Sequence, residues 1–311
     1  MQIFEDFSEV THNDNTIITL GTFDGIHMGH KEIIEAVVQK VSEFGGRSLL
    51  ITFSPHPRKV IPGGNEIKLL STLSEKKKII ETFGIDNLLV IQFTKEFSQQ
   101  TPEEFVEKYL INGIGVKEIV IGYNHHFGKG RGGNIEILKK KGREIGFKVT
   151  EVPECKMDNI IVSSTKIRKA LVAGDIVKAN KMLGRFYSFE GVVVQGDKRG
   201  RELGFPTANL LVENEDKLLP ATGIYAAECV VEEEKHNALL NIGSRPTFHE
   251  AGEIIPEVYI IDFNKKIYNQ TVQVNVVEWI RGEEKFSSAE ELVKQMRKDK
   301  ETGLKILKQI N

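Results

Sequence analysis

The distribution of apolar residues changes once along this 311-residue chain, near Gly184. Before that point, short apolar runs alternate with amphipathic stretches of helical spacing, a pattern that predicts β/α units around a parallel sheet. After it, segments of alternating apolar and polar residues follow one another with turn residues between them, which predicts an antiparallel barrel or sandwich. A prior of roughly 150 residues per domain agrees with two domains. We therefore expect an α/β domain over residues 1–184 and a β-rich domain with a terminal helix over residues 185–311.

The expected elements follow from these patterns. In the first half, strands are expected at 16–20, 47–53, 87–93, 117–122 and 148–152, and helices at 31–44, 74–83, 101–110 and 134–145. In the second half, strands are expected at 190–195, 224–231, 238–242, 257–263 and 272–279, before a closing helix that starts after Ser287 and Ser288. Ligands of an open parallel sheet bind outside the carboxyl ends of its strands. The segments 21–30, 52–57 and 122–133 follow three of the expected strands and fall at that edge.

Composition excludes several classes of protein. The chain has 42 Lys and Arg residues against 44 Asp and Glu residues and no basic block of five or six residues, so nucleic acid is not an expected partner. No run of 18 apolar residues occurs and no signal peptide pattern opens the chain, so no membrane partner is expected. Two cysteines, Cys155 and Cys229, fit a reducing compartment as small apolar residues. We expect a soluble, cytoplasmic protein that is a monomer or weak oligomer.

Residues 21–30, Gly-Thr-Phe-Asp-Gly-Ile-His-Met-Gly-His, come directly after a β-prone run. Gly21 and Gly25 let the backbone approach a ligand, and the helix that follows offers unpaired N–H groups and the positive end of a dipole, which together favour a phosphate. His27 and His30 stand where two imidazoles can donate to phosphate oxygens. The spacing resembles the nucleotidylyltransferase signature, in which the pair steadies a nucleotide triphosphate during attack at its α-phosphorus. The alternative is a helix start with two exposed histidines.

Two loops add ring systems and cations to this edge. In residues 52–57, Thr-Phe-Ser-Pro-His-Pro, the prolines hold His56 in a loop, although a simple proline turn is the alternative. Residues 122–133 contain five glycines, Phe127 as a stacking surface, and the cations Lys129 and Arg131. An aromatic ring, an amide and cations suit a planar heterocycle that carries phosphate. Metal binding by the adjacent His125 and His126 is disfavoured, because sequence neighbours point apart and no third ligand is near.

Residues 163–168, Ser-Ser-Thr-Lys-Ile-Arg, predict a second helix N-terminus. One interpretation is an ordinary N-cap. The other is a second phosphate clamp, in which hydroxyls, N–H groups and Arg168 meet a triphosphate from the opposite side.

These four motifs, in this order, resemble the FMN adenylyltransferase half of the prokaryotic bifunctional riboflavin kinase/FAD synthetase family. The resemblance implies a Rossmann-like nucleotidylyltransferase domain. It also implies three groups of site residues. ATP and its phosphates would be handled by Gly21, Phe23, Gly25, His27, His30, Ser164, Thr165 and Arg168. Asn124 would help to hold the reacting phosphates, and the flavin and nucleotide would be bordered by Phe53, His56 and Phe127.

In the second half, residues 191–209 predict a strand that runs into a flap rich in glycine and charge. Gly196, Lys198 and Gly204 suit a flap that folds over phosphates. Thr207 and Asn209 are two apart on a strand, so they share a face and could bind one Mg²⁺ through oxygen. The alternative is an exposed hairpin with a polar strand.

Residues 207–209, 241–248, 257–263 and 281–286 resemble the riboflavin kinase module of the same family. The resemblance implies an antiparallel β-barrel in which Thr207 and Asn209 bind Mg²⁺ and ATP phosphate. It also implies that Glu257 activates the ribityl 5′-hydroxyl, a role that suits a carboxylate on a strand. Two departures bear on kinase efficiency: Asn269 stands where a glycine commonly follows the tyrosine, and residues 249–256 are an acidic lead-in to Glu257.

We therefore expect a bifunctional enzyme with ATP, riboflavin, FMN and FAD as substrates and products, and with Mg²⁺. Phosphorylation of riboflavin is expected in the second domain and adenylylation of FMN in the first. Both reactions transfer phosphorus groups, so positioning and charge neutralisation are expected to carry catalysis. One alternative is a monofunctional FAD synthetase with an inactive kinase-like domain. Another is a non-catalytic flavin-binding regulator.

Overall fold

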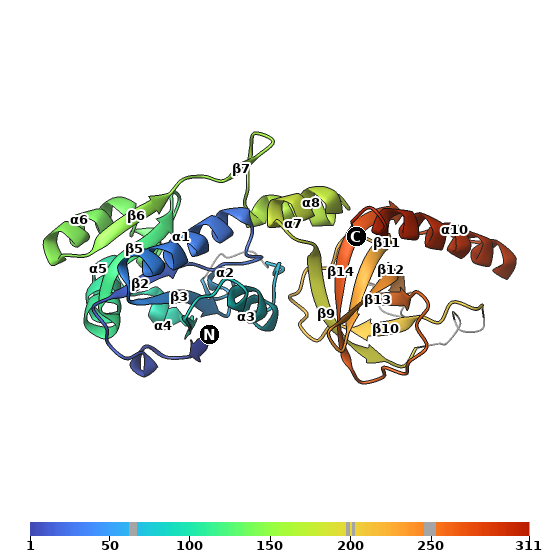
Figure 1. The fold of residues 1–311 in the computed structure, drawn as a ribbon, viewed down its shortest axis with the longest axis horizontal. Helices are drawn as coiled ribbons and strands as arrows, with labels where there is room; N and C mark the ends of the chain where they lie inside the picture. Colours follow the sequence, from blue (N-terminus) through green and yellow to red (C-terminus); the bar gives the residue numbers. More distant parts are fainter. Residues whose placement is uncertain (62–66, 197–199, 201–202, 246–252, 311) are drawn as a thin grey trace. The chain divides into compact units, whose positions relative to one another are not determined.

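The computed structural model describes residues 1–61, 67–196, 200, 203–245 and 253–310 (Figure 1). It divides into two compact units, Met1–Ser163 and Ser164–Asn311.

The first unit is built on a six-stranded, wholly parallel sheet in the order β1-β4-β3-β2-β5-β6. The strands are β1 (Gln2–Phe4), β2 (Thr16–Leu20), β3 (Arg47–Ser54), β4 (Asn87–Gln92), β5 (Val116–Gly122) and β6 (Lys148–Val152). All five residues of β2 are buried, as expected for a central strand that is covered on both faces. The sequence analysis missed β1 because three residues carry no detectable periodicity.

Helices cover both faces of this sheet. They are η1 (Phe7–Glu9), α1 (Met28–Phe44), α2 (Pro57–Val60), α3 (Leu73–Glu81), α4 (Lys95–Ser98), α5 (Pro102–Glu104), η2 (Phe105–Ile114), η3 (Lys129–Arg131) and α6 (Ile135–Ile145). One core cluster joins the sheet to η2 and α6, and another joins the opposite side chains of the strands to α1 and α3. The helix expected at 101–110 begins with a capping box between Thr101 and Glu104 and continues as the π-helix η2.

The strand order creates one crossover point in the sheet. From β2 the chain proceeds to β3 and β4 on one side, and it returns to the other side of β2 with β5 and β6. Crevices for ligands form where the order reverses, at the carboxyl ends of the strands. The turn after β2, the segment after β3 and the loop after β5 all start at this edge. A small hairpin, β7 (Lys156–Met157) with β8 (Ile160–Ile161), follows and was not expected from the sequence.

The second unit is a closed six-stranded antiparallel barrel with helices α7 (Ser164–Val172), α8 (Ile176–Leu183) and α10 (Ala289–Leu307). Of the two expected architectures, barrel and sandwich, the structure has the barrel. The strand order is β10-β13-β12-β11-β14-β9. The strands are β9 (Tyr187–Val194), β10 (Ala208–Leu211), β11 (Gly223–Val231), β12 (Glu234–Arg245), β13 (Glu253–Ile260) and β14 (Thr271–Arg281).

Helices α7 and α8 are fastened to the barrel. The Asn180 side-chain amide donates to the carbonyls of Val276 and Val277 at 2.9 and 3.1 Å, and its oxygen accepts from the Tyr187 N–H at 2.6 Å. The compact unit that contains the barrel therefore starts at Ser164. A boundary between the adenylyltransferase and kinase domains after residue 184 stays a prediction.

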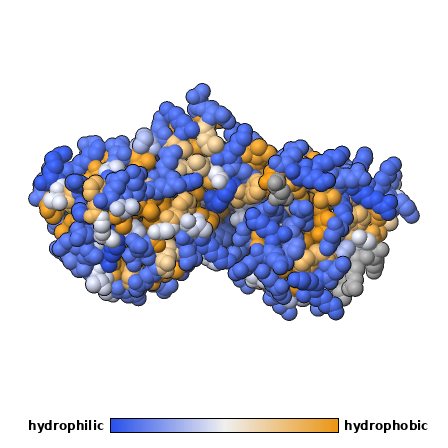
Figure 2. All heavy atoms as spheres, in the orientation of Figure 1, coloured by the Kyte–Doolittle hydropathy of each residue, from blue (hydrophilic) through white to orange (hydrophobic). Residues whose placement is uncertain are grey.

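The terminal helix α10 is capped as expected, since the Ser288 hydroxyl accepts from the Glu291 N–H. It is tied to the barrel by Arg281 of β14, whose guanidinium binds both carboxylate oxygens of the buried Asp299. Figure 2 shows mostly hydrophilic residues along the visible side of α10. Within the described ranges, no helix has both the length and the apolar character needed to cross a membrane.

Candidate active sites

The turn between β2 and α1 has a constrained backbone. Phe23 and Ile26 have φ angles of 45° and 36°, in the left-handed region that bulky and β-branched residues avoid. Gly25 has a φ of 80°, and a Cβ there would lie 2.7 Å from Leu70 Cδ1. Such a conformation persists only where its surroundings enforce it, a situation common at ligand sites.

The two histidines of the turn lie against each other. His27 is the N-cap of α1 and accepts at Nδ1 from the His30 N–H at 3.3 Å. The two imidazole rings stack with centroids 3.7 Å apart, and the Phe23 ring meets His30 edge-on at 5.1 Å. His27 is buried and His30 half-buried. The structure thus brings together the pair that the sequence analysis selected.

A second segment, just before α3, fastens this turn. The buried carboxylate of Asp24 accepts from the N–H groups of Leu70 and Ser71 at 3.0 to 3.2 Å. The Ser71 hydroxyl in turn accepts from the Gly25 N–H at 3.1 Å. No role for Asp24 or Ser71 can be predicted from the sequence, because contacts between residues 46 positions apart leave no local pattern.

The residues expected to border the flavin meet through aromatic rings. The ring centroid of Phe53, at the end of β3, lies 6.1 Å from that of Phe97. The Phe97 centroid in turn lies 6.1 Å from that of Phe105. Phe105 in turn lies 6.0 Å from Phe127 of the loop after β5. Phe53 and Phe127, both half-buried, therefore belong to one aromatic cluster of the first unit. His56 caps the short helix α2, where its Nδ1 accepts from the Arg58 N–H at 3.2 Å.

In the loop after β5, Asn124 is exposed and its carbonyl accepts from His126 Nδ1. Phe127 and Gly133 exchange backbone hydrogen bonds of 3.0 and 2.9 Å, which closes the loop. Burial, followed by the positive charges of His126 and Arg131, lowers the pKa of His125 to about 4, so this imidazole is neutral at pH 7. Among the described residues, no group of three or more His, Cys, Asp or Glu side chains could hold a metal ion.

The hydroxyl-rich segment occupies the start of α7, as expected. The helix begins at Ser164, Thr165 is exposed and Arg168 is half-buried. These residues belong to the second compact unit, so their approach to His27 and His30 stays a prediction.

The barrel brings its candidate residues together through strand register. Asn209 of β10 stands opposite Glu257 of β13, and the Thr207 hydroxyl lies 3.4 Å from Glu257 Oε2. A Cβ on Gly196 would collide with the Asn209 amide, so the start of the predicted flap also lies here. Gly204 has a φ of 82°, and Lys198 lies outside the described residues.

Asn241 of β12 lies in the motif at 241–248, and the sequence alone predicts no role for it. It stands opposite Glu257 on the other side of β13, and residues paired in register share one face of a sheet. Its Oδ1 is buried without a hydrogen-bond partner among the described residues. A Cβ on Gly243 would lie 2.7 Å from Glu283 Oε1 and 3.5 Å from Asn241 Nδ2, so the motif at 281–286 also reaches this place.

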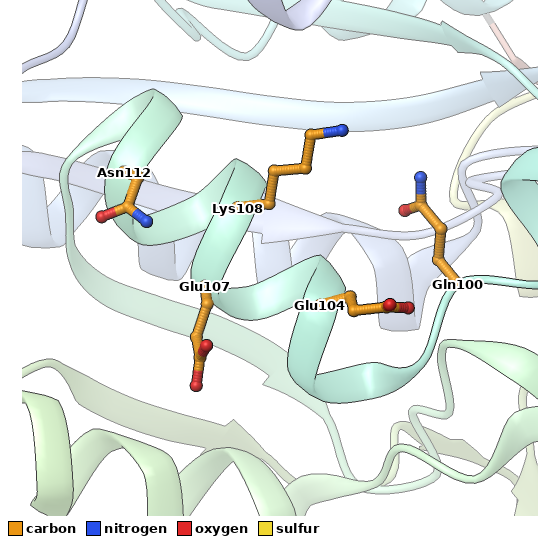
Figure 3. Close-up of a pocket in the computed structure, with 5 residues that line it drawn as sticks. All are labelled: Gln100, Glu104, Glu107, Lys108 and Asn112. Atoms are coloured by element: carbon orange, nitrogen blue, oxygen red, sulfur yellow. The ribbon is translucent and has the colours of Figure 1, made fainter.

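A surface hollow of about 440 Å³ lies beside α5 and η2, and Figure 3 shows the five side chains that line it. The residues that line it are all polar: Gln100, Glu104, Glu107, Lys108 and Asn112. None of them is a predicted site residue. The hollow is therefore separate from both candidate sites.

Comparison with known proteins covers both units. Residues 9–166 match the family described as FAD synthetase, and residues 183–307 match the family described as riboflavin kinase. A bifunctional riboflavin kinase/FMN adenylyltransferase from Listeria monocytogenes is 37% identical over 290 residues, which are 92% of this chain and 91% of that protein. One from Bacillus subtilis is 36% identical over 298 residues, with coverage of 93% and 92%. A crystal structure of a macrolide-efflux protein from Streptococcus pneumoniae has a TM-score of 0.88 at 29% identity and covers 97% of both chains.

Proposed function

Because this chain belongs to the bifunctional riboflavin kinase/FMN adenylyltransferase family, with both activities, we propose a division of labour between the two residue clusters. Riboflavin and ATP give FMN and ADP at the cluster around Glu257. FMN and ATP give FAD and pyrophosphate at the turn around His27 and His30. The observation that supports this division is that the two clusters lie in separate compact units, Met1–Ser163 and Ser164–Asn311.

In adenylyl transfer, a phosphate oxygen of FMN attacks the α-phosphorus of ATP and the bond to pyrophosphate breaks. Because His27 Nδ1 accepts from the His30 N–H, its proton resides on Nε2, which can donate to a phosphate oxygen. The first turn of α1 adds N–H donors and the positive end of its dipole. Ser164, Thr165 and Arg168 supply further donors, and Asn124 helps to hold the reacting phosphates. Phe53, His56 and Phe127 border the flavin and the nucleotide.

In riboflavin phosphorylation, Glu257 accepts the proton of the ribityl 5′-hydroxyl while that oxygen attacks the γ-phosphorus and ADP leaves. The Thr207 hydroxyl, 3.4 Å from Glu257 Oε2, orients the carboxylate. Gly196, Lys198 and Gly204 serve as phosphate-binding residues of this reaction.

The oxygen donors in the barrel fit Mg²⁺. This ion prefers oxygen ligands and binds through few protein groups together with substrate phosphates. Thr207 and Asn209 would hold it, beside the buried Oδ1 of Asn241. When bound, the ion neutralises charge on the transferred phosphoryl group.

The chain acts on small molecules in the cytoplasm as a monomer or weak oligomer. Two free cysteines and a net charge of −2 support the location and the lack of a nucleic-acid partner.

Chromatography of flavins after incubation with ATP and Mg²⁺ tests the division. His30→Ala is expected to convert riboflavin to FMN but to form almost no FAD. Glu257→Gln is expected to lose roughly 10²–10⁴-fold in riboflavin phosphorylation while it still makes FAD from added FMN. His12→Ala and Glu278→Gln, at exposed positions, are the matched controls. Loss of both activities in either folded variant contradicts the assignment.

A further inference from the structure

Lys76 of α3 is buried beneath the turn that carries the two histidines. Its side chain is 6% exposed, although lysine is almost never fully buried without a partner. Its ammonium donates to the Thr22 carbonyl at 2.7 Å and to the Thr52 hydroxyl at 3.2 Å. The Thr52 hydroxyl itself donates to the Thr22 carbonyl at 3.2 Å. These three groups form a closed network of hydrogen bonds.

This network joins two segments of the candidate adenylyltransferase site. Thr22 lies at the start of the turn that leads to His27, and Thr52 directly precedes Phe53 at the end of β3. One ammonium therefore fixes the spacing between the histidine turn and the start of the flavin-bordering segment. The same turn is held by the contacts of Asp24 with the segment before α3, so α3 and its lead-in form one clamp.

The fold alone does not account for the charge of Lys76. A buried ammonium loses its hydration, and an apolar side chain of similar length would fill the same space at lower cost. The Thr22 carbonyl would still accept from Thr52 without it. Burial lowers the pKa of Lys76 from 10.5 to about 8, and the negative charge of Asp24 opposes this change. A group that is costly to bury at a ligand site often serves function at the expense of stability.

We propose that Lys76 is a positioning residue for adenylyl transfer, which acts through Thr22 and Thr52 to hold the histidine turn where it meets the nucleotide phosphates. This inference rests on the proposed assignment of His27 and His30 to those phosphates. In this role Lys76 acts through its hydrogen bonds to the Thr22 carbonyl and the Thr52 hydroxyl, and it orients the turn that carries the histidines.

The test compares Lys76→Met with Lys78→Met, which removes the same charge from an exposed position of α3. Three quantities are measured on each full-length variant: kcat and KM for ATP and FMN in adenylyl transfer, riboflavin phosphorylation, and the melting temperature at pH 7. Lys76→Met is expected to lower kcat/KM for ATP about 10- to 100-fold, since small misplacements of reacting groups have effects of this size. Its kinase rate should stay within about twofold of wild type and its melting temperature should not fall.

Lys76→Arg should recover part of the loss, and Lys78→Met should behave as wild type. Thr52→Val offers a second route if Lys76→Met does not fold, because it keeps the volume of the side chain and removes two of the three hydrogen bonds of the network, leaving only the bond from Lys76 to the Thr22 carbonyl. It should also lower kcat/KM for ATP without an effect on the kinase.

Unchanged adenylyl transfer in folded Lys76→Met and Thr52→Val overturns the proposal. So does a loss that only follows a lower melting temperature, with unchanged KM values, because that indicates a purely structural role. His30→Ala separates this failure from failure of the site assignment: if His30→Ala still makes FAD at the wild-type rate, the phosphate role of the turn itself is wrong.

Discussion

The two candidate sites are assembled in different ways. In the first unit the key residues are close in sequence, and a strained turn at the edge of a parallel sheet presents them. In the barrel, Asn209 and Glu257 are far apart in sequence and meet because β10 and β13 pair in register. A turn can be found from a short motif, whereas a register becomes visible only when the strands are placed.

The sites also differ in the polarity of their groups. The turn offers donors, namely the N–H groups of α1 and the imidazoles, with a buried ammonium beneath. The barrel offers oxygen acceptors, with one carboxylate beside a hydroxyl and side-chain amides. Phosphate groups can bind the first set directly, but they need a cation to bridge them to the second.

The largest expected effect is on the rate of adenylyl transfer, when the chain is shortened to end at residue 185 or at residue 163. Fragment 1–185 contains Ser164, Thr165 and Arg168 and should adenylylate FMN. Fragment 1–163 lacks them and should lose roughly 100-fold or more, as expected when phosphate donors are removed. Both rates are measured by flavin chromatography with FMN and ATP.

The complementary fragments test the barrel. Fragments 164–311 and 186–311 should both phosphorylate riboflavin, and the longer one should melt at a higher temperature because it keeps the bonds of Asn180 to β14. Recovery of adenylyl transfer on mixing 1–163 with 164–311 would be the positive control. Equal adenylyl transfer by 1–163 and 1–185 would show that α7 serves only the barrel.

The dependence of stability on pH tests the buried ammonium of the first unit. The pKa of Lys76 is about 8 in the folded chain against 10.5 for the free group, so between these values the unfolded chain binds more protons. The free energy of unfolding of the first unit should therefore rise with pH across this window through Lys76. Below about pH 8, where Lys76 is charged in both states, its burial lowers the free energy of unfolding by the full amount of roughly 3 kcal/mol.

Urea unfolding of wild type and Lys76→Met measures this cost. The stability advantage of the methionine variant should shrink by about 3 kcal/mol from pH 7 to pH 10.5. Trp279, the only tryptophan, lies in the barrel, and its fluorescence provides an internal reference whose transition should not differ between the two proteins. A difference that is constant with pH would mean that Lys76 titrates normally.

A pair of glycine substitutions separates backbone strain from packing in the histidine turn. Gly25 and Gly84 have similar φ angles, 80° and 75°, but only at Gly25 would a Cβ meet a neighbour, Leu70 Cδ1 at 2.7 Å. Alanine at either position should lower the free energy of unfolding by about 1–2 kcal/mol, because its backbone is left-handed. At Gly25 the clash with Leu70 should lower it by about 1–3 kcal/mol more. Denaturant unfolding gives both values, and adenylyl transfer should fall only in Gly25→Ala. Equal effects at the two positions would mean that the turn adapts freely.

Elements and site residues can be predicted from the sequence where the physical signal is local. Apolar runs mark β2, β3 and β4, because strands covered on both faces leave few polar positions. The glycine-rich turn and its histidines were likewise readable within ten residues. Lys76 and Asp24 were missed, since their partners lie 24 to 54 positions away and no periodicity links them. Asn241 was missed because its relation to Glu257 depends on the register of β12 with β13.

Asn241 is therefore the residue on which the register-built site can be tested most finely. Its buried Oδ1 has no hydrogen-bond partner among the described residues, so truncation breaks no bond seen in the barrel and should leave the melting temperature nearly unchanged. If the oxygen faces Mg²⁺ or the ribityl chain, Asn241→Ala should lower riboflavin phosphorylation about tenfold, the size of one good hydrogen bond. Asn237→Ala, on the same strand, is the control, and FAD synthesis from FMN should stay at the wild-type level in both.

A higher Mg²⁺ requirement in Asn241→Ala would indicate that the Asn241 oxygen contacts the metal, and a higher KM for riboflavin would indicate that it contacts the substrate. Phosphorylation equal to that of Asn237→Ala would remove Asn241 from the site and leave Thr207, Asn209 and Glu257 as the residues that the barrel register assembles.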